Sequence, residues 1–304
     1  MLSRVRYLLV AMRPYQWTKN GLVLAALIFA HRWKDPQSLR LAGMAFVAFC
    51  LLSSFAYLLN DLRDVEEDRR HPRKRTRPIA AGLLSSSVAA VGAGVLLLAG
   101  LGLAFAVNAA TGAIAASYVA ITVLYQVGLK AVAIIDVLAV AAGFVLRAVA
   151  GATAIGAEVS PWLLICTVQL ALFLALAKRR GEIVLLKDEA AAHRASLAHY
   201  STYLLDQMIS VVTASTVMSY ALYTISDRTV HIVGSTNLMY TLPFVLYGIF
   251  RYLYLIHNHG EGDAPDRILL TDKPILVNIL LYIVAVFVIL ELGSGSHAPA
   301  SGQP

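Results

Sequence analysis

Long runs of apolar residues, separated by short polar segments, dominate the pattern of this chain. About nine of these runs have the length that an α-helix needs to cross a lipid bilayer. The first run is the weakest, and we expect it to begin as an interfacial helix carrying Tyr15 and Trp17. The predicted spans are 20–33, 41–59, 88–107, 109–126, 131–152, 161–177, 207–225, 237–256 and 274–292.

The composition is that of a membrane protein. Of 304 residues, 59% are apolar and 14% are charged, whereas soluble domains carry about 25% charged residues. We therefore predict an all-α integral membrane protein with about nine transmembrane helices. Residues 1–293 are expected to form a single transmembrane domain, and 294–304, rich in Ser, Gly and Pro, a disordered C-terminal tail.

The distribution of charge predicts an orientation. The net charge is +7, and the excess of positive residues in cytoplasmic loops explains it without a nucleic-acid partner. With the N-terminus inside, twenty lysines and arginines fall in the inner segments and four in the outer ones. We expect a multi-pass protein of the cell membrane with a cytoplasmic N-terminus. Cys50 and Cys166 lie within apolar runs, which favours packing over a disulfide or zinc site.

An acidic cluster follows the second apolar run. Read as a helix, Asp61, Asp64 and Asp68 fall within about 60° of one another. Such like charges repel unless a cation binds them, and Mg²⁺ typically binds through carboxylates together with substrate phosphates. The basic run 69–77 follows at once and offers groups that bind anions. The pattern predicts a cytoplasmic site for a phosphorylated substrate, with these three aspartates as ligands of Mg²⁺.

Two later segments hold unusual polar groups. Lys130 lies just before the predicted span 131–152, and Asp136 and Arg147 lie within it. Ionisable groups inside a membrane span mark a functional cavity by default. Asp136 and Arg147 would be about 16 Å apart along a helix, too far to pair directly. A structural ion pair with a neighbouring helix is the alternative. Lys178 and Arg179 lie near the end of the sixth span, where they suit either a site or the helix dipole and the positive-inside rule.

The acidic spacing and the segment Arg77-Pro78-Ile79-Ala80-Ala81-Gly82 resemble the UbiA-type intramembrane prenyltransferase superfamily. The resemblance implies membrane helices around a polar cavity, here open to the cytoplasm, and Mg²⁺ that binds a diphosphate. Members that act on aromatic substrates carry a second motif, usually with two acids. The matching stretch here has only Asp136. One branch of this superfamily, the decaprenyl-phosphate phosphoribosyltransferases, is resembled more specifically. The resemblance lies in segments 143–151 and 177–179 and, near the start of the chain, in Arg13-Pro14, Gln16-Trp17 and Lys19-Asn20.

That branch implies transfer of 5-phosphoribose from phosphoribosyl diphosphate to a polyprenyl (decaprenyl) phosphate, with release of diphosphate and use of the product for cell-wall arabinan. The expected catalytic residues are Asp61, Asp64 and Asp68, with Asn60 orienting the cluster. The expected substrate-binding residues are Lys19, Lys74, Arg77, Lys130, Asp136, Arg147, Lys178, Arg179 and Glu182.

The main alternative keeps the fold and changes the substrate: a polyprenyl group would move from its diphosphate to an aromatic acceptor. A transporter or channel could also use intramembrane Asp136 and Arg147. It would have no need for three aspartates beside a basic loop. The sequence leaves the oligomeric state open, a homo-oligomer included.

Overall fold

The computed structural model describes residues 2–70, 74–159, 161–186, 195–258, 268 and 271–294. Within these ranges every element is an α- or 3-10 helix, and there is no strand. The chain divides into two compact units, Met1–Val159 and Ser160–Pro304.

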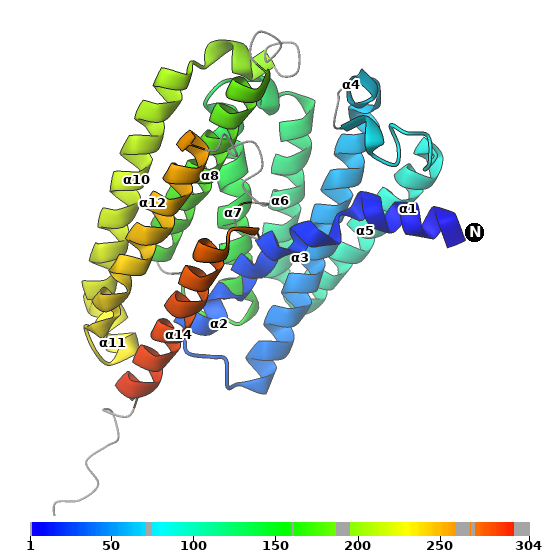
Figure 1. Cartoon of the computed structure of the whole chain (residues 1–304). Helices are drawn as coiled ribbons and strands as arrows, with labels where there is room; N and C mark the ends of the chain where they lie inside the picture. Colours follow the sequence, from blue (N-terminus) through cyan, green and yellow to red (C-terminus); the bar gives the residue numbers. More distant parts are fainter. Residues whose placement is uncertain are drawn as a thin grey trace, which may run out of the picture. The chain divides into compact units, whose positions relative to one another are not determined.

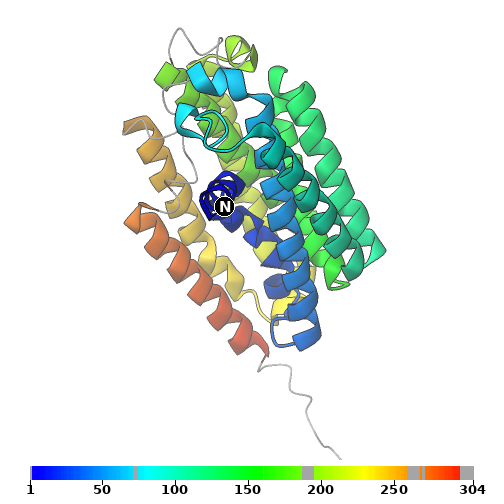
Figure 2. The ribbon, with the colours of Figure 1, turned by 90° about the vertical axis from the view of Figure 1, so that its right-hand side faces the viewer.

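The first unit is built around one long helix, α3, against which α5 packs along its length (Figure 1). Helix α1 runs across α3 rather than alongside it, and Figure 2 shows α1 nearly end-on. The elements of this unit are α1 (Leu2–Met12), η1 (Pro14–Leu24), α2 (Ala25–Phe29), α3 (Pro36–Arg63), α4 (Val65–Arg70), η2 (Lys74–Thr76), α5 (Ser86–Val107), α6 (Ala109–Val127), η3 (Leu129–Ala131) and α7 (Ile135–Ala154).

Polar caps set the limits of these helices. Asp35 caps α3: its carboxylate accepts hydrogen bonds from the backbone N–H groups of Gln37 and Ser38, and Pro36 occupies the first helical position. These bonds, with the Ser38 hydroxyl first, lower the pKa of Asp35. Asn108 ends α5 and begins α6, where its side chain accepts a hydrogen bond from the N–H of Thr111 at 2.7 Å. One polar residue therefore divides two apolar runs into two helices.

The first predicted span, 20–33, is not a single α-helix. The chain forms the 3-10 helix η1 and then the short helix α2, although 3-10 runs longer than about four residues are uncommon. Contacts with other helices stabilise η1. Asn20 is fully buried and accepts a hydrogen bond from Arg147, and the backbone of Val23 lies against Gly151 of α7. A Cβ on Gly151 would stand 1.8 Å from the Val23 carbonyl oxygen, so glycine is required for this approach.

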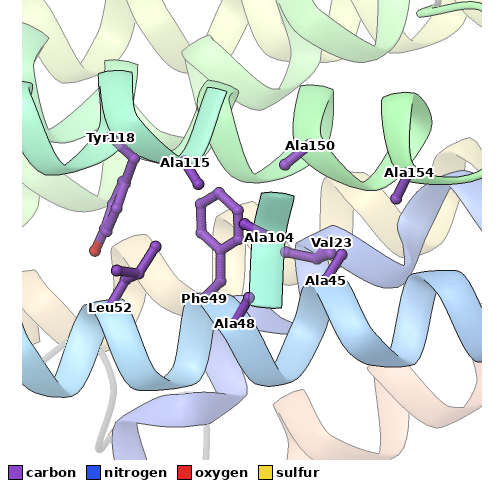
Figure 3. Close-up of a cluster of buried hydrophobic side chains, with 10 residues drawn as sticks. All are labelled: Val23, Ala45, Ala48, Phe49, Leu52, Ala104, Ala115, Tyr118, Ala150 and Ala154. Atoms are coloured by element: carbon purple, nitrogen blue, oxygen red, sulfur yellow. The ribbon is translucent and has the colours of Figure 1, made fainter. Parts of the chain in front are cut away.

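The core of the first unit joins η1, α3, α5, α6 and α7 (Figure 3). Phe49 points from α3 toward α6, and its ring centroid lies 5.3 Å from that of Tyr118. Alanines provide much of the remaining surface, which lets the helix backbones approach closely. The cluster consists of Val23, Ala45, Ala48, Phe49, Leu52, Ala104, Ala115, Tyr118, Ala150 and Ala154.

The second unit consists of α8 (Pro161–Leu186), η5 (Ala195–His199), α10 (Thr202–Ile225), α11 (Asp227–Val233), η6 (Asn237–Thr241), α12 (Leu242–Asn258) and α14 (Lys273–Ser294). Helix α8 packs on α10, and α12 runs beside α14 (Figures 1 and 2). Helix α8 continues to Leu186, nine residues beyond the predicted end of its span at 177. The predicted tail, apart from Ser294 at the end of α14, lies outside the described residues.

Seven helices of the described chain are long and apolar enough to cross a membrane: α3, α5, α6, α7, α10, the segment Asn237–Asn258, and α14. The prediction of an all-α, multi-pass membrane protein is confirmed. The predicted number of nine spans is not confirmed, and the first of the nine is replaced by η1 and α2.

Candidate active site

Asp61, in the last turn of α3, lies at the centre of a cluster of charged side chains. Only 1% of its side chain is exposed. Its Oδ1 accepts hydrogen bonds from Nη2 of Arg13 at 2.5 Å and from Nη1 of Arg77 at 3.1 Å. Its Oδ2 is also buried and has no hydrogen-bond partner among the described residues. A buried carboxylate oxygen without a donor is costly, so this atom is suited to receive a further cationic ligand.

Asp68, in α4, shares Arg77 with Asp61. Nη1 of Arg77 donates to Oδ2 of Asp68 at 2.6 Å, and only 2% of the Asp68 side chain is exposed. Burial raises the pKa of Asp68, and the charges of Arg77 and Lys74 act in the opposite direction. The basic segment thus returns to the acids that precede it, and Arg77 joins the two buried carboxylates.

Asp64 faces a different partner, because the helical stripe is interrupted there. Helix α3 ends at Arg63, and Asp64 has a backbone conformation outside the helix before α4 begins. Its Oδ1 accepts a hydrogen bond at 2.8 Å from Nζ of Lys130, in the connection between α6 and α7. The carbonyl oxygen of the half-buried Asn60 accepts a hydrogen bond from the Asp64 N–H at 2.9 Å. The three aspartates therefore share one region but not one continuous helical face.

The residue types fit a hard divalent cation, since carboxylate oxygens are the ligands that Mg²⁺ prefers. The unpaired Oδ2 of Asp61 supports that fit. Within the described residues, however, no three His, Cys, Asp or Glu side chains stand together as a finished metal site. Basic side chains neutralise the carboxylates instead. A metal bound here would therefore compete with these basic side chains for the carboxylates.

Arg13 is the contact that the sequence analysis did not assign to the site. Its side chain is 17% exposed, and its guanidinium lies over the ring of Tyr57 at 4.9 Å from the centroid. Its backbone is left-handed, with φ 53°, and it precedes Pro14. Such a conformation of a non-glycine residue costs of the order of 1–3 kcal/mol and persists only where the surroundings enforce it. The signal in the sequence was an arginine before a proline at the start of the chain, which does not identify a partner 48 residues away.

Arg147 lies in a separate buried network. Its guanidinium is donor to three neutral groups: Oδ1 of Asn20 at 2.7 Å, the carbonyl of Gly143 at 2.9 Å and the hydroxyl of Tyr118 at 2.9 Å. Asn20 in turn donates to the hydroxyl of Ser53 at 3.1 Å. In the described part of the chain Arg147 forms no ion pair, and its hydrogen bonds go to these neutral groups instead. Tyr118 and Asn20 were not predicted as its partners.

The remaining predicted residues of the first unit lie on three different elements. Lys19 is half-buried on η1, and Lys74 is half-buried on η2. Asp136 is fully buried in the first turn of α7. Two residues before it stands Ile134, whose φ of 69° is a marked outlier for a β-branched residue.

The predicted residues of the second unit lie together on α8. Lys178 is exposed, whereas Arg179 is 3% exposed and donates a hydrogen bond to Glu182. Next to them, Nε of Arg180 donates to Oδ1 of Asp206 on α10 at 2.6 Å, a pair that the sequence analysis did not predict. These cations lie inside α8 and not at its end, because the helix continues to Leu186.

Comparison with known proteins identifies a family and similar enzymes. The model of the UbiA prenyltransferase family matches residues 21–271. A decaprenyl-phosphate phosphoribosyltransferase from Corynebacterium glutamicum is 38% identical over 282 residues, covering 91% of this chain and 84% of the relative. The enzyme of that name from Mycolicibacterium smegmatis is 35% identical over 289 residues, covering 91% and 90%.

A solved UbiA homologue from Archaeoglobus fulgidus, bound to GPP and Mg²⁺, superposes with a TM-score of 0.71 at 21% identity, covering 94% of this chain and 99% of that one. At this identity the likeness concerns the fold. The family match and the two relatives show more: the chain belongs to the UbiA prenyltransferase family and is a transferase.

Proposed function

We propose that this protein transfers 5-phosphoribose from phosphoribosyl diphosphate to a polyprenyl phosphate, decaprenyl phosphate being the expected acceptor, with release of diphosphate and dependence on Mg²⁺. The observation that carries the proposal is the cluster of Asp61, Asp64 and Asp68, two of them buried, with its basic partners. It offers carboxylates for a metal and cations for phosphates in one place. The names of the relatives, which are 34–38% identical, support phosphoribose as the group transferred.

The charges of the cluster suit a diphosphate leaving group. As the bond between C1 of the ribose and the diphosphate oxygen breaks, negative charge develops on the diphosphate. Arg77 and Lys74 would bind it, and arginine in particular makes bidentate contacts with phosphate. Asp61, Asp64 and Asp68 would hold Mg²⁺, which supplies further neutralisation of the departing charge. Asn60 precedes Asp61 directly and would orient the cluster.

The acceptor needs no general base. A polyprenyl phosphate is already an anion at neutral pH, so one of its oxygens can form the new bond to C1 without losing a proton first. The predicted cations Lys19, Lys130, Arg147, Lys178 and Arg179 remain candidates for its phosphate or for the other phosphates of the donor. Asp136 is a candidate for the ribose hydroxyls or a second metal, and Glu182 for holding Arg179.

We also propose that the site faces the cytoplasm, where a soluble phosphoribosyl donor is available, and that the product is a precursor of cell-wall arabinan. The support for the orientation is the excess of lysine and arginine in the segments on the side of the acidic cluster.

The experiment that tests the function uses purified full-length protein, Mg²⁺, a polyprenyl phosphate, and phosphoribosyl diphosphate radiolabelled in the ribose. We expect the label to move into the organic phase only when both the metal and the acceptor are present. The matched control replaces the acceptor with a polyprenyl diphosphate.

The rival function is prenyl transfer to an aromatic acceptor, favoured by the family description and by the solved homologue that binds GPP. If the label stays in the aqueous phase while a polyprenyl diphosphate and an aromatic acid react, the proposed function is wrong and the rival is correct.

A further inference from the structure

Arg13 is bonded to the very carboxylate that the proposed metal would need. Oδ1 of Asp61 receives two guanidinium groups, from Arg13 at 2.5 Å and from Arg77 at 3.1 Å, while Oδ2 receives none within the described chain. A divalent cation bound at Oδ2 of Asp61 would compete with the two guanidinium groups for the single negative charge of this carboxylate. A metal at Asp61 therefore weakens the attraction that holds the arginines at Oδ1.

The two arginines differ in the carboxylate partners that they keep once a metal binds Asp61. Arg77 also donates to Asp68 at 2.6 Å, so it keeps a carboxylate partner when Asp61 is taken. Among the described residues, Asp61 is the only carboxylate that Arg13 contacts. A guanidinium that is 17% exposed and loses its counter-ion needs another anion.

The balance of charge points to that anion. Three carboxylates, of Asp61, Asp64 and Asp68, stand against four cations, which are Arg13, Lys74, Arg77 and Lys130. The cluster carries a charge of about +1 before a metal binds and about +3 with a divalent metal, by simple addition of formal charges. A diphosphate ester offsets this excess, whereas a single phosphate offsets less of it.

We propose that Arg13 is a donor-binding residue: it neutralises Asp61 in the empty site, and it binds the diphosphate of the donor once a metal occupies Asp61. This inference rests on the proposed function only in that the donor is a diphosphate ester. The arginine approaches from the junction between α1 and η1, whereas Lys74 and Arg77 approach from the segment after α4. The diphosphate is thus held between two separate parts of the chain.

The test measures the binding of Mg²⁺ alone, and of inorganic diphosphate in saturating Mg²⁺, by calorimetry on the full chain in detergent. In Arg13→Gln the competitor for Asp61 is gone, so we expect Mg²⁺ alone to bind several-fold more tightly. We expect diphosphate to bind about 10-fold to 100-fold more weakly, since a charged hydrogen bond is lost. The opposite signs separate this role from a merely structural one.

Arg63→Gln is the matched control. It removes the same charge at the end of α3, where Arg63 is exposed and donates to the carbonyl of Val127 at 3.2 Å. We expect it to leave both affinities near those of the unchanged protein. Arg13→Lys keeps the charge without the planar fork, so we expect diphosphate binding between the two extremes. If Arg13→Gln does not fold, as judged by thermal melting, Arg13→Lys carries the test through its weaker diphosphate binding.

Unchanged affinities in the Arg13 variants would overturn the inference, as would an equal loss of metal and diphosphate binding. The outcome is independent of the group transferred. Absence of phosphoribosyl transfer by the unchanged protein, with both shifts still present in Arg13→Gln, would refute the proposed function and leave the role of Arg13 intact.

Discussion

Arg147 is a buried charge whose hydrogen bonds, in the described part of the chain, all go to neutral groups. Its guanidinium is 7% exposed, stacks near the rings of Tyr118 and Phe144, and donates to Asn20, Gly143 and Tyr118. These partners belong to η1, α6 and α7, so the side chain links three elements. We infer that Arg147 holds η1 in place, in addition to its predicted role in substrate binding.

The first prediction concerns this network. Arg147→Leu leaves the Asn20 and Tyr118 side chains and the Gly143 carbonyl without their partner, and we expect a loss of about 3 kcal/mol in the free energy of unfolding. Tyr118→Phe removes one hydrogen bond while keeping the ring beside Phe49, and should cost about 1 kcal/mol. Thermal melting in detergent measures both. A stable Arg147→Leu protein that no longer binds substrate would instead assign the residue to the substrate.

At the scale of the element, η1 depends on a close approach to α7. The second prediction is that Gly151→Ala is strongly destabilising, because its Cβ would stand 1.8 Å from the carbonyl oxygen of Val23, and backbone atoms must move to relieve the clash. Gly94→Ala in α5 is the control, since nothing lies within 4 Å of a Cβ there. We expect a much lower melting temperature for the first variant and no loss for the second. Equal melting temperatures would show that η1 can shift freely.

The third prediction concerns α14, which begins beside Asp272. Its carboxylate accepts hydrogen bonds from Arg251 at 2.9 Å and from the backbone N–H of Ile275 at 2.9 Å. Asp272→Ala should lose both contacts, whereas Asp272→Asn keeps the cap and loses the ion pair. We expect Ala to be less stable than Asn by about 1 kcal/mol, measured by thermal melting at neutral pH. Equal stability of the two variants would exclude the capping role.

The same carboxylate predicts a dependence on pH. The hydrogen bond from Arg251, followed by the N–H of Ile275, lowers the pKa of Asp272 in the folded protein. Its contribution to stability is therefore complete above the ordinary pKa of an aspartate and is lost as the pH falls through the lowered value. The difference in melting temperature between the unchanged protein and Asp272→Asn should shrink in acid. A difference that grows as the pH falls would contradict this assignment.

At the scale of the whole molecule, the sequence predicted the long helices well and the first segment poorly. Helix α6 spans Ala109–Val127 against a prediction of 109–126, because an apolar run bounded by Asn108 contains the information locally. The 3-10 helix η1 could not be foreseen, since it depends on Asn20 meeting Arg147 across 127 residues. Helix α8 passes through its cations to Leu186, so charge did not end that helix.

In the candidate site, too, contacts between residues close in sequence were predicted, and contacts between distant residues were not. Asp61, Asp68 and Arg77 were predicted together and lie together, because they follow one another within a short stretch of chain. The contact of Lys130 with Asp64 spans 66 residues and that of Arg13 with Asp61 spans 48. A single sequence marks such residues as unusual but does not pair them, because helix packing brings them together.

The most direct test of the account is the rate of diphosphate release from phosphoribosyl diphosphate, in the presence of a polyprenyl phosphate, as Mg²⁺ is increased. It compares the unchanged protein with Asp61→Asn, both shown to be folded by thermal melting. We predict a saturable dependence on Mg²⁺ in the former and a loss of at least about 100-fold in the latter, since the carboxylate that holds the metal is gone. Near-normal release by Asp61→Asn at saturating Mg²⁺ would contradict the role of the acidic cluster.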